Sequence, residues 1–227
     1  MMRQTFIIMF NKTIQMKNLF KLLLVAFAIT TTIFTACMKD NDFDMDKLQE
    51  EQRIKDSIEK ARVDGIIAAQ APILAEYVST NLPEATLIDS LGIWYDVSEW
   101  GEENSYTYSF GNNGYLIAPT ITVKYTGRLL NGTVFDKTEE GKTASFSLAE
   151  VIPAWQLAFI PMAIKINGTE YKVGGITPNG LQKGAKIRFV TSSPLAYDAT
   201  EKKDEQGQVT IPANSPLDFT IEVVDIK

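Results

Sequence analysis

The central and C-terminal parts of the chain alternate between apolar and polar positions, which is the pattern of strands with one buried face. Residues 93–97, 120–130 and 134–135 are predicted strands, and the Asn131-Gly132 pair supplies a tight hairpin turn between the last two. The remaining predicted strands cover residues 143–148, 186–191 and 217–223. The alternation predicts an inward-facing set that consists of Ile121, Val123, Tyr125, Ile187, Phe189, Leu217, Phe219, Ile221 and Val223.

The period changes once inside this region, between residues 151 and 159. Val151, Trp155 and Phe159 share one face of a helix there, and Pro153 is compatible with its first turn. Strands that surround one short helix predict an α+β fold with a mostly antiparallel sheet. A chain of 227 residues with 45% apolar content can bury one sizeable core, so we expect one principal domain.

An N-terminal segment over residues 44–69 is rich in Glu, Lys, Gln and Ala and predicts a helix that is exposed on most sides. Its apolar residues at helical spacing are Leu48, Ile54, Ile58 and Ala61. Pro72 is expected to kink or restart this helix, with a second helical piece over residues 72–80. For this helical extension, residues 44–82, three roles are open: a spacer, an arm through which two copies form a homodimer, or a helix that packs on the domain.

The first 36 residues have the pattern of an export signal. Lys17 and Lys21 precede an apolar run over residues 22–28, which is too short to span a membrane and is followed by small residues. Met16 is the expected true start, because it opens a signal of ordinary length. We therefore expect residues 1–36 to be absent from the mature protein.

The tetrad Phe-Thr-Ala-Cys that ends at Cys37 resembles a bacterial lipobox, in which the cysteine is lipidated and becomes the first mature residue. Residues 37–42 look like the acidic sequence that follows this cysteine in Bacteroidetes-type surface lipoproteins, and a plain solvated linker over residues 37–43 is the alternative. The resemblance implies a lipid anchor in the outer membrane of the cell envelope, with the protein either periplasmic or surface-exposed. The other interpretation is an ordinary signal peptide followed by a buried cysteine.

Charge and composition exclude several classes of function. The chain has 22 basic and 28 acidic residues; four basic ones lie within residues 1–36, so the rest has 18 against 28 and a formal charge of −10. Such an acidic chain without a basic cluster lacks the surface that nucleic acid binding requires. The absence of histidine excludes Ser-His and Cys-His nucleophile pairs and histidine-bound zinc, and Cys37 alone cannot form an intramolecular disulfide. We expect neither a metal nor a cofactor.

Four motifs resemble the FKBP family of prolyl isomerases and follow one another in the family's order. Residues 123–136 carry its Tyr-x-Gly-x-Leu-x-x-Gly-x-x-Phe-Asp hairpin without a gap. Residues 151–155 resemble the start of the family's helix, residues 184–197 its later strand and loop, and residues 211–219 its closing Ile-Pro-x-x-x-x-Leu-x-Phe signature. The resemblance implies a half-barrel sheet wrapped on a short helix within residues 83–227, and the activity of a peptidyl-prolyl cis-trans isomerase.

The resemblance also implies an aromatic pocket for the prolyl residue of a proline-containing exported or envelope polypeptide. Trp155 would form its floor, the backbone N–H of Ile152 and the hydroxyl of Tyr197 would hold substrate carbonyls, and Asp136 would lie beside the twisting amide. In this interpretation the catalytic residues are Tyr125, Asp136 and Tyr197, and the substrate-binding residues are Phe135, Val151, Ile152, Trp155, Ile211 and Phe219.

Several positions depart from the family pattern. Ala154 and Asp198 replace glycines, Ala144 stands where an aromatic residue often closes the pocket, and residues 198–209 form a long charged loop. An alternating segment with a second Asn-Gly turn predicts an inserted hairpin near residues 161–178, close to the pocket mouth. Two alternatives therefore stay open: a catalytically weak or inactive peptide-binding or chaperone-like lipoprotein, and a structural surface lipoprotein that acts through its N-terminal helix.

Overall fold

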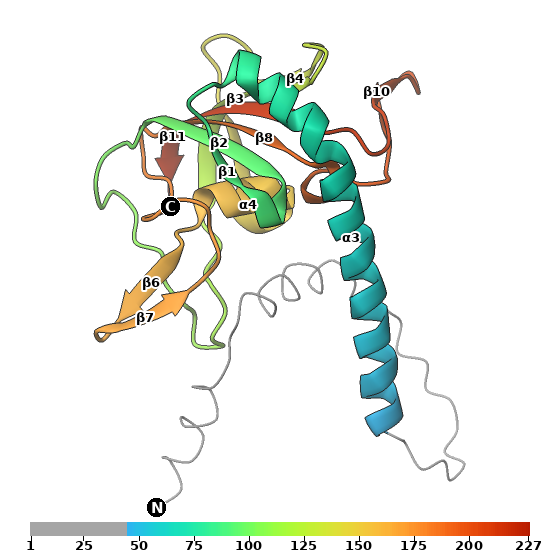
Figure 1. The fold of residues 1–227 in the computed structure, drawn as a ribbon. Coiled ribbons are helices and arrows are strands. Elements are labelled where there is room, and N and C mark those ends of the chain that lie inside the picture. The colour runs from blue at the N-terminus through green and yellow to red at the C-terminus, as the bar shows by residue number, and fades with distance from the viewer. Residues whose placement is uncertain (1–44) are drawn as a thin grey trace, which may run out of the picture.

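The computed structural model describes residues 45–227, which form three layers (Figure 1). A long helix lies on the outer face of a curved antiparallel sheet, and one short helix lies against the inner face. The expected α+β fold, with a sheet wrapped on a short helix and a helical extension before it, is confirmed. The predicted signal peptide, Cys37 and the predicted linker lie outside the described residues.

The main sheet is antiparallel, with strand order β1-β2-β8-β11-β3-β4 and with β5 paired to β3. Its strands are β1 (Thr86–Ile88), β2 (Ile93–Glu99), β3 (Thr120–Leu129), β4 (Val134–Lys137), β5 (Ala144–Ser147), β8 (Lys186–Thr191) and β11 (Leu217–Ile226). All except β1 correspond to predicted strands. Gly132, with a φ of 88°, forms the expected turn between β3 and β4, because glycine adopts this conformation without strain.

The inner face of the sheet and helix α4 (Pro153–Phe159) enclose the main hydrophobic core. The residues predicted to face inward are all buried except Tyr125, which is half-buried. Helix α4 buries Trp155, Leu157 and Phe159 against them. Full burial of one such large apolar side chain stabilises the fold by about 1.5–3 kcal/mol. The core therefore fixes α4 at the centre of the sheet's concave face.

Helix α3 (Met45–Asn81) is continuous through Pro72, so the predicted restart at this residue is wrong. Pro72 lies on an exposed side of the helix, where water can bind the carbonyl of Ala68 that has no amide partner. Ile67 and Leu74, on either side of the proline, are both buried. Packing on both sides therefore keeps the two halves in one helix.

The two halves of α3 have different surroundings. The C-terminal half lies along the domain, whereas the N-terminal half projects beyond the sheet (Figure 1). Ile54 and Ile58, in the projecting half, are 50% and 65% exposed. The helix therefore packs on the domain with one half, which was one of the three roles left open, and extends away from it with the other. Within residues 45–227 no helix is both long enough and apolar enough to cross a membrane.

The C-terminal half of α3 packs on the outer face of the sheet. Leu74, Val78 and Val190 are buried together in a second, smaller hydrophobic cluster. Beside it, the Tyr77 hydroxyl donates to Asp218 at 2.8 Å, and Arg188 donates to both carboxylate oxygens of Asp218 at 3.1 and 2.7 Å. Because Asp218 is fully buried, these donors compensate a charge that would otherwise be costly to bury.

The inserted hairpin exists, with strands β6 (Ala163–Ile166) and β7 (Thr169–Lys172). Its Asn-Gly turn has the two positive φ angles, 50° and 81°, that such turns require. We expected this hairpin close to the pocket mouth, and its contacts lie elsewhere. The ring of Tyr171 packs edge-to-face on Phe110 at 6.0 Å, and the hairpin projects on the side of the domain away from α3 (Figure 1).

Candidate active site

Aromatic rings from three strands meet the ring of Trp155 on the inner face of the sheet; we call this group the ring cluster. Centroid distances from Trp155 are 5.2 Å to Tyr125, 5.6 Å to Phe219 and 5.8 Å to Phe146, all in edge-to-face geometry. Phe135 on β4 joins the cluster by packing on Phe219 at 5.7 Å. Rings from distant parts of the chain therefore converge at one place.

The ring cluster has a buried base and a more accessible rim. Trp155, Ile211 and Phe219 form the base, and each is less than 5% exposed. Half-buried residues from four segments of the chain pack against the same hydrophobic core and form the rim; they are Tyr125, Phe135, Val151, Ile152 and Tyr197. An apolar base with a few polar groups at its rim is the usual construction of a small-ligand site.

A short hydrogen bond joins the rim to an exposed carboxylate. The Tyr125 hydroxyl donates to Oδ2 of Asp136 at 2.6 Å, and both residues belong to the β3–β4 hairpin. Burial, followed by the hydrogen bond to Asp136, raises the pKa of Tyr125 well above its ordinary value. Its hydroxyl is therefore a neutral donor at physiological pH and holds the carboxylate at the edge of the cluster.

Two further donors at the rim have no protein partner within residues 45–227. These are the backbone N–H of Ile152, the N-cap residue of α4, and the hydroxyl of Tyr197. Burial, and then the charge of Asp136, raises the pKa of Tyr197, so its hydroxyl also stays protonated. Both groups are available to donate a hydrogen bond to an acceptor oxygen of a bound ligand.

The long charged loop predicted after Tyr197 contains a small hairpin, with strands β9 (Lys202–Lys203) and β10 (Val209–Ile211). The hairpin brings Nζ of Lys202 to 4.5 Å from the centre of the Tyr197 ring. At this distance the ammonium is attracted to the ring face. A positive charge therefore lies directly beside the rim.

Sequence reasoning missed one ring of the cluster, Phe146, and the steric role of Gly127 beside it. Phe146 follows Ala144 by two positions in β5, and the period-two alternation of a strand places both on one face. A Cβ on Gly127 would lie 2.5 Å from Cζ of Phe135 and 2.9 Å from Cε1 of Phe219. Glycine at position 127 therefore lets both rings approach β3.

Two departures from the family pattern are accommodated by the fold. Ala154 is fully buried, so its methyl group packs in the main hydrophobic core between α4 and the sheet. Asp198 has a φ of 49°, in the left-handed region that glycine adopts most easily. The turn after Tyr197 thus keeps a left-handed residue although the glycine is replaced.

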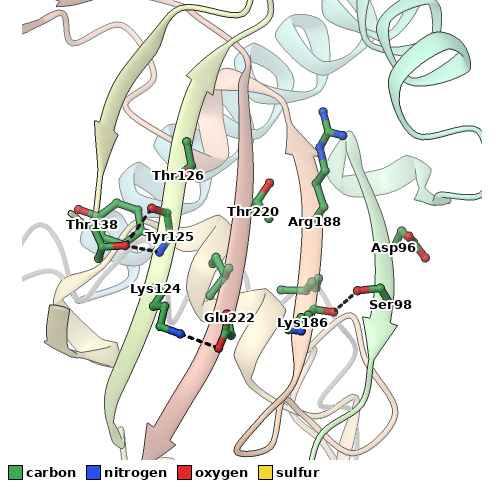
Figure 2. Close-up of a pocket in the computed structure, with 12 residues that line it drawn as sticks. Asp96, Ser98, Lys124, Tyr125, Thr126, Thr138, Lys186, Arg188, Thr220 and Glu222 are labelled. Carbon is green, nitrogen blue, oxygen red and sulfur yellow. Dashed lines mark hydrogen bonds and ion pairs between the residues drawn. The ribbon is translucent and has the colours of Figure 1, made fainter. Parts of the chain in front are cut away.

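A separate polar groove of about 420 Å³ lies on the outer face of the sheet, across β2, β8, β11 and β3 (Figure 2). Both of its lysines are paired: Lys124 lies 3.0 Å from Glu222, and Lys186 lies 2.8 Å from Glu99. Paired, exposed charges of this kind are typical of a solvated sheet face. The ring of Trp155 lies on the opposite face; Tyr125 is the one member of the ring cluster that also lines the groove, and none of the groove's charges belongs to the cluster.

The FKBP-type peptidyl-prolyl cis-trans isomerase family matches residues 117–224, which contain every residue of the ring cluster. These residues form an FKBP-type domain. The FKBP-type peptidyl-prolyl cis-trans isomerase FkpA of Buchnera aphidicola subsp. Baizongia pistaciae is 38% identical over 108 residues. The match covers 47% of this chain and 33% of that protein, so the chain spans about a third of the length of this curated relative.

Two crystal structures resemble the chain at low sequence identity. That of FkpA from Escherichia coli has a TM-score of 0.46 at 22% identity and covers 95% of this chain and 83% of its own. That of a peptidyl-prolyl cis-trans isomerase from Pseudomonas syringae pv. tomato has a TM-score of 0.46 at 23% identity, with coverages of 73% and 96%.

Proposed function

We propose that the protein is a peptidyl-prolyl cis-trans isomerase that binds the X-Pro bonds of exported or envelope proteins in the ring cluster. The observation that carries this proposal is a buried aromatic base centred on Trp155 with two unpaired donors at its rim. These donors are the N–H of Ile152 and the hydroxyl of Tyr197. A prolyl ring fits the base, and the flanking carbonyls of an extended peptide match the donors.

Rotation about a prolyl amide is slow because it removes the resonance of the C–N bond, a barrier of about 18–20 kcal/mol. In the twisted state the carbonyl oxygen carries less negative charge and the nitrogen is more basic. An apolar, water-poor site therefore favours the twisted amide over the more polar planar one. This chemistry requires neither a nucleophile nor a general base, and it is compatible with a sequence that contains no histidine.

Each named residue has a distinct role in this proposal. The prolyl ring lies on Trp155, while the donors of Ile152 and Tyr197 hold the carbonyls on either side of the rotating bond. Asp136, oriented by Tyr125, lies beside the twisting amide. The remaining rim residues exclude water from the rotating bond.

The proposal includes export and lipid attachment at Cys37, which rest on the sequence pattern alone. Acylation would keep the domain in the cell envelope, where newly exported polypeptides with proline residues would be its clients. Mass spectrometry of the membrane fraction is expected to find an acylated Cys37 at the mature N-terminus. A soluble protein with an unmodified cysteine would contradict this part of the proposal.

One observation favours a second candidate, a peptide-binding module without catalysis. Lys202 covers the ring of Tyr197, and the charged β9–β10 hairpin lies beside the rim. A charge at this position brings water to a site that catalysis requires to be dry. Such a protein would hold proline-containing segments of unfolded chains without accelerating their isomerisation.

The two candidates are separated by the cis-to-trans rate of an X-Pro peptide in the presence of the wild-type protein, Trp155→Ala and Trp100→Ala. Trp100 is 52% exposed and serves as the matched control. We expect catalysis by the wild type and by the control, and at least a tenfold loss in Trp155→Ala, with circular dichroism confirming its fold. A wild-type rate equal to that in buffer, together with binding of an unfolded polypeptide, would favour the non-catalytic module.

A further inference from the structure

Helix α3 is bound to two loops that carry residues of the proposed site. Gln70, which is 9% exposed, donates from Nε2 to the hydroxyl of Ser193 at 2.9 Å and to the backbone oxygen of Asn214 at 3.0 Å. Its Oε1 accepts the N–H of Ser193 at 2.9 Å. Because an unsatisfied buried amide is costly, these three hydrogen bonds specify the position of both loops relative to the helix.

The two loops also bind each other. The N–H of Asp198 donates to the oxygen of Ser193 at 2.8 Å, and the N–H of Asn214 donates to the oxygen of Asp198 at 2.7 Å. Tyr197 lies within the first loop, and Ile211 lies just before the second. Gln70 therefore holds a hydrogen-bonded unit that contains one rim residue and one base residue of the ring cluster.

A second contact from α3 reaches the residue that follows Tyr197. The guanidinium of Arg62 donates to the two carboxylate oxygens of Asp198 at 3.1 and 2.5 Å and is itself held by Glu59 at 2.7 and 2.9 Å. Asp198 is the left-handed residue of the turn. Two parallel bonds from a planar guanidinium fix the orientation of a carboxylate, which a single point charge does not do.

The part of α3 that makes these contacts has a firm support. Leu74 and Val78 are buried on the sheet, and Tyr77 donates to the buried carboxylate of Asp218. Ile67 contacts the turn before β2 so closely that a Cβ on Gly92 would lie 2.9 Å from its Cγ2. The polar contacts to the Tyr197 loop therefore start from a helix that is packed against the sheet.

We propose that helix α3 positions Tyr197, with Gln70 and Arg62 as positioning residues that hold the turn of residues 193–198. This role rests on the proposed isomerase function. Without these contacts the turn is free to move, and the Tyr197 hydroxyl loses its fixed direction toward a bound peptide. A displacement of about 1 Å in such a group can reduce catalysis by up to about a hundredfold.

The kinetic test compares Arg62→Ala with Arg53→Ala in the 227-residue chain. Arg53 is a matched control because it lies on the same helix and pairs with Glu50 at 3.1 Å. We expect Arg62→Ala to lower kcat/KM about fivefold to twentyfold and Arg53→Ala to leave it unchanged. Asp198→Gly, which keeps the left-handed turn and removes the carboxylate, is expected to reproduce the loss.

A double variant separates positioning from general destabilisation. If Arg62 acts through the Tyr197 hydroxyl, Arg62→Ala has no further effect on kcat/KM in a Tyr197→Phe background. Losses that multiply in the double variant would overturn the proposal.

Hydrogen exchange gives a readout that does not depend on activity. The Asp198 amide is expected to exchange at least about tenfold faster in Arg62→Ala and in Gln70→Ala than in Arg53→Ala, while amides in β8 keep their protection. A wild type without isomerase activity would overturn the proposed function. An active wild type with unchanged exchange at Asp198 in both variants would overturn the positioning role.

Discussion

The Tyr125 hydroxyl and the Asp136 carboxylate lie 2.6 Å apart within one hairpin, so Tyr125, at the rim of the ring cluster, orients the carboxylate of Asp136. The half-buried ring of Tyr125 is itself held edge-on against Trp155 at 5.2 Å. A change at either end of this pair is therefore transmitted to the other. The proposed mechanism requires the carboxylate in one place beside the rotating amide.

Tyr125→Phe is expected to lower kcat/KM about threefold to tenfold, because Asp136 loses the donor that orients it. Asp136→Ala should lower it at least as much, and the double variant should show less than the product of the two losses. The free energy of unfolding should change by no more than about 1.5 kcal/mol, since one hydrogen bond at the surface is lost. Peptide isomerisation and urea unfolding measure both quantities. Full activity in Tyr125→Phe would contradict this role, and Tyr115→Phe, at an exposed position, is the control.

Gly127→Ala is expected to displace the rings of Phe135 and Phe219, which a Cβ would approach to 2.5 and 2.9 Å. Overpacking of this kind typically costs about 1–3 kcal/mol of stability, and the displaced rings should reduce peptide binding. Gly65→Ala is the matched control, because nothing lies within 4 Å of a Cβ on this helical glycine. The control should raise stability by roughly 0.5–1 kcal/mol with unchanged activity. Equal behaviour of the two variants in thermal unfolding and isomerisation would refute the packing argument.

The folded protein should lose stability as the pH rises above about 10, where an unperturbed tyrosine ionises. Burial is the main cause that raises the pKa values of Tyr77, Tyr106, Tyr108, Tyr125 and Tyr197. The unfolded chain thus releases protons from these hydroxyls while the folded chain retains them, so their stabilising contribution is complete below pH 10 and falls above it. Urea unfolding at pH 8, 9, 10 and 11 should show a constant free energy followed by a decline. A free energy that is constant up to pH 11 would be inconsistent with these shifts.

Lys202 should influence which residues are accepted near the prolyl bond. Its ammonium lies 4.5 Å from the Tyr197 ring, so it favours a peptide with an acidic side chain over one with a basic side chain. We expect Lys202→Ala to reduce the ratio of kcat/KM for Glu-Pro and Lys-Pro peptides about twofold to fivefold at low salt. Lys203→Ala, whose ammonium pairs with Glu201 at 2.8 Å, should leave the ratio unchanged. Identical ratios in all three proteins would show that Lys202 does not select substrates.

The parts of the fold that follow from local pattern could be predicted from the sequence. Alternation identified β8 with its bounds and placed Ile187 and Phe189 inside, because a strand with one buried face repeats every two residues. The helix at Trp155 followed from a change of period. The meeting of Tyr125, Trp155 and Phe219 required the family resemblance, since alternation alone does not state which strands are neighbours.

The features that sequence reasoning missed depend on contacts between distant segments. Pro72 does not break α3, because tertiary packing on both sides of it outweighs the local preference. The hydrogen bonds of Gln70 join residues 123 and 144 positions apart, and no periodic pattern records such a pair. The inserted hairpin was predicted from its turn, but its position depends on packing against Phe110, in a segment without a regular pattern.

Helix α3 is about 55 Å long for its 37 residues, and about 27 Å of it precedes Val63, the first buried side chain of the helix. Only the C-terminal half of this helix is packed on the sheet, and the N-terminal half projects from it. A sideways force on the projecting end produces its largest torque where the packed part begins, and the side chains there include Arg62 and Gln70. A force on the N-terminal end of α3 would therefore act on the contacts of Arg62 and Gln70 with the Tyr197 loop, beside the proposed prolyl site.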